Sequence, residues 1–437
     1  MDFHFTVKLK QHTPLIHFQH DQAGATLRAT EVKAKLDKFL INKKGGWNDV
    51  PASWKILTGA KENPEALDYK IRINTGEIVY EDIEKKRFDP RKGKEVTDTF
   101  PCFFANLGEK DAKEQKRFSY SRGDIEVKFF AFNQELLDFI QQNSNEFFIR
   151  HNFGSRQSKG FGCFLPVDLN MSQVPSDFYY FTVNSNNDRT IFATIDLFYK
   201  TLRGGVNGAS HPQQQGFEKG IYLKPMIFLY AASDENKIEW EKRAIKQQLF
   251  KSKLNKHQID HPLEPNFEPS PLHHEAGEKR ARIVRDWLGL STDQTWKDYP
   301  QDRRDEQIKK IEVDKAGKEK AEKDAIARMK SPLLFKPVKI NNRECRVYFC
   351  AENKAEVVNT FKNARFKITS NSSGNLTLDV WKEFDLNNFL EFAFAQGRIE
   401  SAISIDPEKG HSDKAESIKN EIIRIYKEIR KNKSNHA

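Results

Sequence analysis

Cysteine is scarce in this sequence of 437 residues, and its four copies show no pairing pattern. Cys102, Cys163, Cys345 and Cys350 form no CxxC pair and do not have the spacing of a zinc ribbon. This argues against a disulfide framework and against the common cysteine-based zinc modules. It favours buried thiols in a reducing cytosol, so we expect a cytoplasmic protein with no metal site and no cofactor.

Long apolar runs are also missing. No stretch approaches the roughly 18 apolar residues that a membrane-spanning helix needs, and the start, "MDFHFTVKLKQHTP", alternates instead of forming an apolar core. We therefore expect neither a signal peptide nor a membrane partner. The sequence has no GxxxxGK[ST], HExxH or GxSxG motif and no paired-carboxylate motif, which argues against an NTPase, a metalloprotease or a serine hydrolase.

Positive charge is in excess. The 72 Lys and Arg residues outnumber the 62 Asp and Glu residues and give a formal net charge of +10. A polyanion, nucleic acid first, is therefore a plausible partner, although many basic proteins bind none. Hydrophobic residues make up 38% of the chain and include 34 phenylalanines, enough for the cores of two domains.

Residues 1–172 show an alternating order of strand and helix patterns. Period-two alternation predicts a strand over 3–9, and the spacing of apolar residues predicts a helix over 25–42. The further predicted elements are a hairpin of 69–74 with 77–84, a strand at 124–132, a helix at 133–143 and a strand at 161–169. This is the βαββαβ order of a ferredoxin-like domain.

Residues 173–437 repeat this order less completely. Strands are predicted at 177–184, 221–230 and 346–350, helices at 189–202 and 354–364, a strand pair at 365–370 with 375–381, and helices at 386–396 and 415–433. Segment 233–330 holds 22 Lys and Arg against 20 Asp and Glu, a balance that favours solvated helices. The predicted fold class is therefore α+β, with two tandem ferredoxin-like (RRM-like) domains, 1–172 and 173–437. A charged helical insertion, 233–330, interrupts the second domain.

The stretch "FGSRQSKGFGCF", residues 153–164, is a glycine-rich basic loop before the last strand of the first domain. Glycines allow positive φ and a close approach of backbone to ligand, and successive exposed amides hold anions. Arg156 and Lys159, with Arg150 upstream, can neutralise phosphates. Phe153 or Phe161 can stack on a base or anchor the loop in the core, and an ordinary basic turn is an equally good interpretation.

"SRQSKGFGCF" resembles the glycine-rich loop of the RAMP superfamily, the Cas-seven-like RNA-binding proteins of CRISPR systems. "LKQHTPLIHF" is similar to their opening strand, and "ATLRATEVKAKL" is similar to the helix after it, introduced by Leu27-Arg28. "LFYKTLRGGVNG" and "KSPLLFKPV" resemble segments of the two-domain members. The chain is most similar to subunit one of the Cmr effector module of type III-B systems.

This resemblance implies a non-catalytic structural subunit that holds guide RNA and its target duplex for antiviral defence, together with other CRISPR effector subunits. The second domain lacks a Gly-Phe-Gly of its own, and Arg203 in "RGGVNG" either contacts RNA or belongs to a plain helix end. The candidate RNA-binding residues are Arg28, Lys33, Arg150, Gly154, Arg156, Lys159, Gly160, Gly162 and Arg203.

The alternative is a metal-independent endoribonuclease that processes repeat RNA or cuts target RNA. Its candidates are His20 and Asp21, in a loop where the Cas-seven group uses an aspartate for target cleavage. Either residue can activate a ribose 2′-OH, but the polar residues of a helix-capping loop explain the pattern more simply. The His17 and His20 pair, even with Cys163, is a weak zinc signal.

Overall fold

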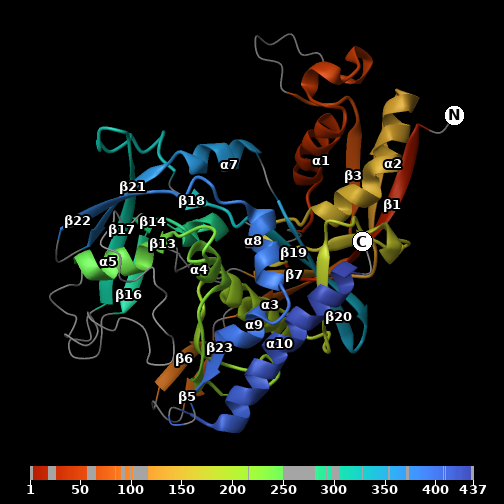
Figure 1. Ribbon diagram of the computed structural model, residues 1–437. Helices are drawn as coiled ribbons and strands as arrows, with labels where there is room; N and C mark the ends of the chain where they lie inside the picture. The colour runs from red at the N-terminus through yellow and green to blue at the C-terminus, as the bar shows by residue number, and fades with distance from the viewer. Residues whose placement is uncertain are drawn as a thin grey trace. The chain divides into compact units, whose positions relative to one another are not determined.

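Helices and mainly antiparallel sheets build the chain (Figure 1), which confirms the α+β class. The computed structural model describes residues 3–17, 26–56, 65–83, 85–89, 94–98, 100–102, 117–214, 216–249, 281–291, 293–297, 305–326, 328–352, 355–370, 374–406, 408 and 410–434. The chain forms two compact units that are discontinuous in sequence: 1–196, 334–350 and 432–437 in the first, and 197–333 and 351–431 in the second. The boundary between 172 and 173 stays a prediction. None of the described helices has the length and apolarity needed to cross a membrane.

A four-stranded antiparallel sheet of order β3–β8–β1–β9 is the centre of the first unit. Its strands are β1 (His4–Gln11), β3 (Lys70–Asn74), β8 (Ile125–Phe130) and β9 (Phe164–Pro166). The alternation predicted for 3–9 and 124–132 is confirmed, since apolar residues such as Leu9, Val127 and Phe129 are buried on one face. The residues between them are exposed on the other face.

Helices α1 (Ala29–Lys43) and α2 (Gln134–Arg150) pack on the apolar face of this sheet, where Val32, Leu36 and Ile140 share its core. Both helices run beside β1 and β3 in Figure 1. The Asn133 side chain accepts a hydrogen bond of 3.0 Å from the Leu136 amide and caps α2. The last turns of α2 extend beyond the predicted end at 143 because Phe147, Phe148 and Ile149 are buried there.

The predicted hairpin of 69–74 with 77–84 is wrong. Strand β3 pairs with β8, whereas β4 (Glu77–Asp82) pairs with β7 (Arg117–Arg122) in another sheet that also holds β2 (Leu15–Ile16). Thr75 and Gly76 do not reverse the chain, because the register runs on from Asn74 opposite Glu126 to Glu77 opposite Arg122. The charged segment that follows contains the antiparallel pair β5 (Lys85–Asp89) and β6 (Lys94–Asp98).

A second sheet of the first unit has the antiparallel order β10–β20–β19. Its strands are β10 (Tyr179–Val183), β19 (Leu333–Asn341) and β20 (Glu344–Ala351). Helix α3 (Asp188–Arg203) follows β10, as predicted. It ends at two glycines, where the amides of Gly204 and Gly205 both donate to the Lys200 carbonyl and Gly205 has a φ of 77°. These glycines are thus a helix stop.

The second unit contains several small sheets. Their strands are β11 (Val206–Ala209), β12 (Glu218–Leu223) and β23 (Ile403–Ile405) in one, β13 (Glu239–Trp240) and β14 (Ala281–Arg282) in another, β15 (Leu290–Ser291) and β18 (Arg328–Met329) in a third, and β16 (Asp293–Lys297), β17 (Asp305–Val313), β21 (Arg365–Ser370) and β22 (Asn375–Asp379) in the largest. Its helices include α4 (Met226–Ala231), α5 (Glu241–Leu249), α7 (Ala355–Lys362), α8 (Leu386–Phe394), α9 (Arg398–Ala402) and α10 (Ser412–Ser434). The predicted pair of 365–370 with 375–381 is confirmed as β21 with β22.

Two predictions for this unit are wrong. The strand expected over 221–230 ends at Leu223, because Pro225 stops it and starts α4. The described part of 233–330 is helical in α5 and in a 3₁₀ helix at Arg285–Leu288, and more of its residues lie in strands, with β17 inside the largest sheet. Charge there does not mean solvation: Lys310 of β17 is buried and pairs with buried Asp286.

Candidate nucleic-acid interface

The glycine-rich loop after α2 is shaped by positive φ angles. Gly154, Gly160 and Gly162 have φ values of 74°, 98° and 68°, and Arg156 has 57°. A Cβ atom at Gly162 would overlap the carbonyl oxygen of Phe153. These glycines are required because the backbone approaches other parts of the same unit closely.

The amides of this loop are occupied by other parts of the chain. Gly154 N donates to the Glu31 carboxylate at 2.9 Å, and Ser155 N donates to the Ile16 carbonyl at 2.8 Å. Gly162 N donates to the Pro14 carbonyl at 2.9 Å. The expected row of exposed amides that would hold a phosphate is therefore wrong for these positions, since intramolecular acceptors already satisfy them.

Two motifs that supported the RAMP resemblance meet at this point. The Thr13 hydroxyl donates to the Gly160 carbonyl at 2.7 Å and accepts from the Cys163 amide at 2.9 Å. With the Pro14 and Ile16 carbonyls, it holds the Thr-Pro-Leu segment against the Gly-Phe-Gly segment. The two motifs are thus hydrogen-bonded to each other and form one structural unit.

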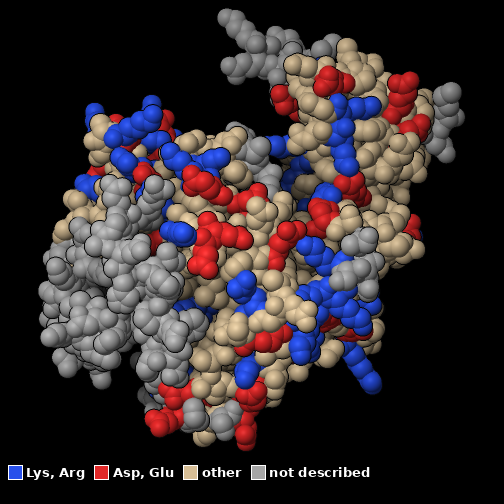
Figure 2. All heavy atoms as spheres, viewed as in Figure 1, with Lys and Arg blue, Asp and Glu red and all other residues tan. Residues whose placement is uncertain are grey.

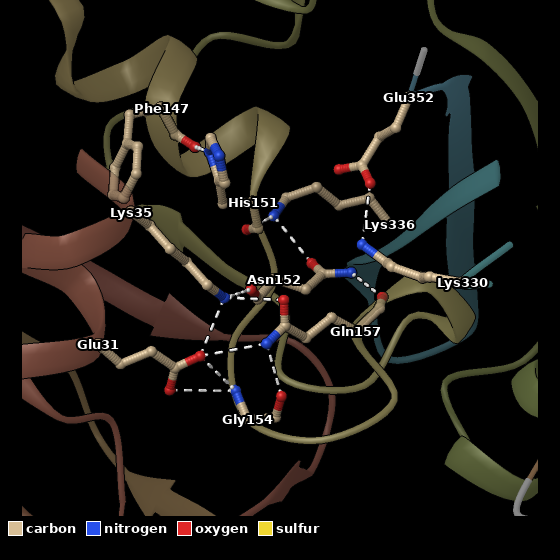
Figure 3. A network of polar contacts seen from close by, with 10 residues as sticks. All are labelled: Glu31, Lys35, Phe147, His151, Asn152, Gly154, Gln157, Lys330, Lys336 and Glu352. Atoms are coloured by element: carbon tan, nitrogen blue, oxygen red, sulfur yellow. Dashed lines mark hydrogen bonds and ion pairs between the residues drawn. The ribbon is translucent and has the colours of Figure 1, made fainter. Parts of the chain in front are cut away.

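Helix α1 is joined to the loop by a polar network (Figure 3). Glu31 Oε1 accepts from Lys35 Nζ at 2.9 Å and from Gln157 Nε2 at 3.2 Å, in addition to the Gly154 amide. Lys35 Nζ also donates to the Asn152 carbonyl at 2.7 Å and to Gln157 Oε1 at 2.8 Å. The charge of Lys35 is thus directed inward, to the loop.

Strand β19 contacts the other side of the loop. Asn152 Nδ2 donates to the carbonyls of Gln157 and Phe335, each at 2.8 Å. Lys336 Nζ, almost fully buried, donates to the His151 carbonyl at 2.7 Å and to Asn152 Oδ1 at 3.1 Å (Figure 3). Burial lowers the pKa of Lys336, because the charged form loses solvation in the protein interior.

The two phenylalanines of the loop belong to the core. Phe161 is fully buried and stacks on Phe192 with ring centroids 4.0 Å apart. Phe153 is also fully buried and packs against Phe147 and Phe164. Of the two roles left open by the sequence, anchoring is the one observed.

The predicted cations of the first unit are mostly engaged. Arg150 makes a bidentate contact with Asp177 and another with Glu146, and these contacts raise its pKa. Lys33 pairs with Asp37 at 2.9 Å. The Lys159 ammonium nitrogen is buried. Direct phosphate contact by Arg150 or Lys33 would therefore first require breaking their ion pairs, and contact by Lys159 would require exposing its buried ammonium group.

Two predicted arginines of the first unit, Arg28 and Arg156, are half-buried. Arg28 takes the N-cap position of α1 with an extended backbone. Arg203 belongs to the second unit, where it donates to the Gly289 carbonyl at 2.6 Å and lies 4.0 Å from the Asp286 carboxylate. The alternative catalytic pair, His20 and Asp21, lies outside the described residues.

Sequence reasoning missed a set of exposed cations on the open face of the four-stranded sheet. Lys70, Arg72 and Lys128 point away from the helices, as the alternation of burial along β3 and β8 shows. The signal was present in "YKIRIN" and "IEVKFF", where Lys and Arg alternate with apolar residues and must therefore lie on the face opposite the core.

Across the described ranges, no cluster of three or more His, Cys, Asp or Glu side chains is arranged to hold a metal ion. Cys163 is fully buried, and burial raises the pKa of its thiol. His17 is buried as well.

Two domain families match this chain. The Cmr1 N-terminal domain matches residues 2–206, and the Cmr1 C-terminal domain matches residues 222–435. No curated protein matches the chain. The crystal structure of apo Cmr1 from Pyrococcus furiosus is similar at 11% identity, with 92% of this chain and 98% of that chain covered and a TM-score of 0.30. Because the two domain families span nearly its whole length, the chain belongs to the Cmr1 family, subunits of the Cmr effector complex of type III-B CRISPR systems.

Proposed function

We propose that this chain is a non-catalytic, RNA-binding structural subunit that holds guide RNA and its target duplex in the cytoplasm for antiviral defence. The observation that carries the proposal is the match of both Cmr1 domains, residues 2–206 and 222–435. Its partners would be guide RNA, target RNA and the other effector subunits.

The tandem ferredoxin-like arrangement is part of the same proposal. In the first unit, the order β3–β8–β1–β9 with α1 and α2 on one face supports it, because a βαββαβ chain gives this order. For the second repeat, the support is β10, α3, β19 and β20 in chain order with sheet order β10–β20–β19.

Charge supplies the attraction in this proposal. The net charge of +10 favours a polyanion, and each phosphate contact by Lys or Arg releases counterions. In this proposal the glycine-rich loop has a structural role: it follows α2 and is hydrogen-bonded to α1 and, through Asn152, to β19. Arg28, at the N-cap of α1, and Arg156, in the loop, are half-buried, and we expect these two cations to contact the RNA.

Fluorescence anisotropy of labelled single-stranded guide RNA, titrated with the purified full chain in 50 to 300 mM KCl, tests this function. We expect the logarithm of the association constant to fall linearly with the logarithm of salt concentration, with a slope of about −0.7 for each phosphate contact. An affinity that does not change with salt, or a complex recovered with its protein partners but without RNA, would contradict the proposal.

The endoribonuclease alternative is tested separately. The chain is incubated with repeat RNA and with guide–target duplex, in EDTA and in Mg²⁺. We expect no cleavage product. A product that disappears in both His20→Ala and Asp21→Ala would replace the structural role with the catalytic one.

A further inference from the structure

The four-stranded sheet of the first unit has one face without helices. Register places Lys70 of β3 beside Phe130 of β8, and Arg72 of β3 beside Lys128 of β8. These residues share the face opposite α1 and α2, since the residues between them are buried in the core. We call Lys70, Arg72, Lys128, Phe130 and Phe132 the sheet-face patch.

Aromatic rings at one end of this patch are open to solvent. Phe132 is 78% exposed, and its ring lies edge-on to Phe130 with centroids 5.0 Å apart. It also meets Phe3, itself 39% exposed, at 6.0 Å. Phe132 precedes the N-cap of α2, where an apolar residue often packs on the fourth helical residue. The fourth residue of α2, Leu137, is buried, whereas Phe132 is exposed, so Phe132 does not pack on Leu137 to stabilise the start of the helix.

The cations of the patch are neighbours in the sheet and form no ion pair among the residues that the structure describes. Arg72 and Lys128 are direct register partners, and like charges in this position destabilise a sheet. No ion pair joins Lys70, Arg72 or Lys128 to a carboxylate in the part of the chain that the structure describes. Two exposed acids lie near these cations: Glu126 is on the same face of β8, two residues from Lys128 and opposite Asn74 and Lys8, and Asp124 precedes the strand.

The helical side of the same layer is different. Its lysines pair with carboxylates, as in Lys33 with Asp37, Lys35 with Glu31 and Lys43 with Glu146. Figure 2 shows basic and acidic side chains together over α1 and α2. A phosphate backbone would therefore find neighbouring cations outside ion pairs on the sheet face, whereas most lysines of α1 are paired with carboxylates.

We propose that the sheet-face patch binds single-stranded RNA, with bases stacked on Phe132 and Phe130 and phosphates held by Lys70, Arg72 and Lys128. The inference rests on the proposed RNA-binding function and adds a surface to it. Exposed rings beside unpaired cations on a pleated sheet suit a strand whose bases have flat faces and whose backbone is anionic. An acidic protein surface would use the cations but would gain little from isolated, edge-on rings.

The test measures anisotropy of a fluorescein-labelled 15-nucleotide oligouridine RNA with the full-length protein. We expect Phe132→Ala to weaken binding about 5- to 150-fold, which is the effect of losing one base stacked on an aromatic ring. Lys128→Gln and Arg72→Gln should each reduce the magnitude of the salt slope by about 0.7. The matched controls are Phe217→Ala, which removes another exposed ring, and Lys38→Gln on the outer side of α1; both should bind as the wild type does.

Crosslinking gives a second measurement that is independent of affinity. With 4-thiouridine in the RNA, we expect the crosslinked peptide to contain residues 125–132. Wild-type binding that is salt-sensitive and is unchanged in all three patch variants would overturn this inference and leave the proposed function intact. Loss of binding to the other effector subunits with unchanged RNA affinity would assign the patch to a protein and would also overturn it. Absence of RNA binding by the wild type would refute the proposed function itself.

Discussion

The buried imidazole of His12 predicts that the first unit loses stability in mild acid. His12 follows β1 and is 7% exposed. Its amide donates to the Cys163 carbonyl at 2.9 Å, and its Nδ1 accepts from the Lys339 amide at 3.0 Å. An acceptor nitrogen carries no proton, so the folded state needs the neutral imidazole.

The charged surroundings act in the same direction. Burial, as the largest cause, and the positive charges of Lys10, Lys336 and Lys339 together lower the pKa of His12 from 6.5 to about 3. Asp188 pairs with the Lys339 ammonium group at 2.7 Å and compensates part of that charge, so burial remains the largest cause.

The magnitude follows from linkage. Below pH 6.5 the unfolded chain takes up a proton at His12 and the folded chain does not, so the stability that is present above pH 6.5 is lost as pH falls towards 3. Between pH 7.5 and 5.0 the loss from this group is about 2 kcal/mol, from about 1.36 kcal/mol per pH unit.

Urea unfolding at pH 7.5, 6.0 and 5.0, followed by pulsed hydrogen exchange and mass spectrometry of β1 and β19 peptides, measures this loss in the first unit. His12→Asn keeps an acceptor near the Nδ1 position and cannot titrate. It should therefore lose about 2 kcal/mol less than the wild type over this pH range. His4→Asn, at an exposed position, is the matched control and should behave as the wild type. Equal losses in the wild type and His12→Asn would refute the reasoning.

Three further substitutions test the packing. Gly162→Ala should lower the melting temperature strongly, since its Cβ would overlap a backbone carbonyl, while Gly204→Ala, with open space, should not; equal effects would contradict this. Asn152→Ala should cost about 2–4 kcal/mol in urea unfolding, because it leaves two buried carbonyls and an ammonium group short of partners. Lys310→Met should cost about 3–5 kcal/mol by leaving the Asp286 charge buried, and Asp286→Leu combined with it should restore most of this; no restoration would contradict the pairing.

Local pattern was sufficient wherever an element shows its own period. The strand at 3–9, the helix within 25–42 and the strand at 124–132 were all predicted from alternation or helical spacing, and β1, α1 and β8 confirm them. The glycine-rich loop was also identified as a special backbone segment. Its positive φ angles confirm that glycine is needed there.

Errors arose where a residue's partner is distant in sequence. In the sequence, Thr75-Gly76 looks like a hairpin turn, but the strands on either side of it pair with β8 and β7 and not with each other. The charges of 233–330 suggested solvated helices, but Lys310 and Asp286 neutralise each other inside the second unit. Neither outcome is encoded in the composition of the segment itself.

The sequence by itself determined the α+β class, the main elements of the first unit and the RAMP resemblance, because hydrophobic period and short motifs are properties of neighbouring residues. Only the tertiary structure decided what the basic side chains contact. It engages the Gly154 amide with Glu31 and the Arg150 guanidinium with Asp177, while Arg72 and Lys128 remain on an open sheet face. The physical reason is that a charge is compensated by whatever the fold brings within a few ångströms of it, and that neighbour is usually remote in the chain.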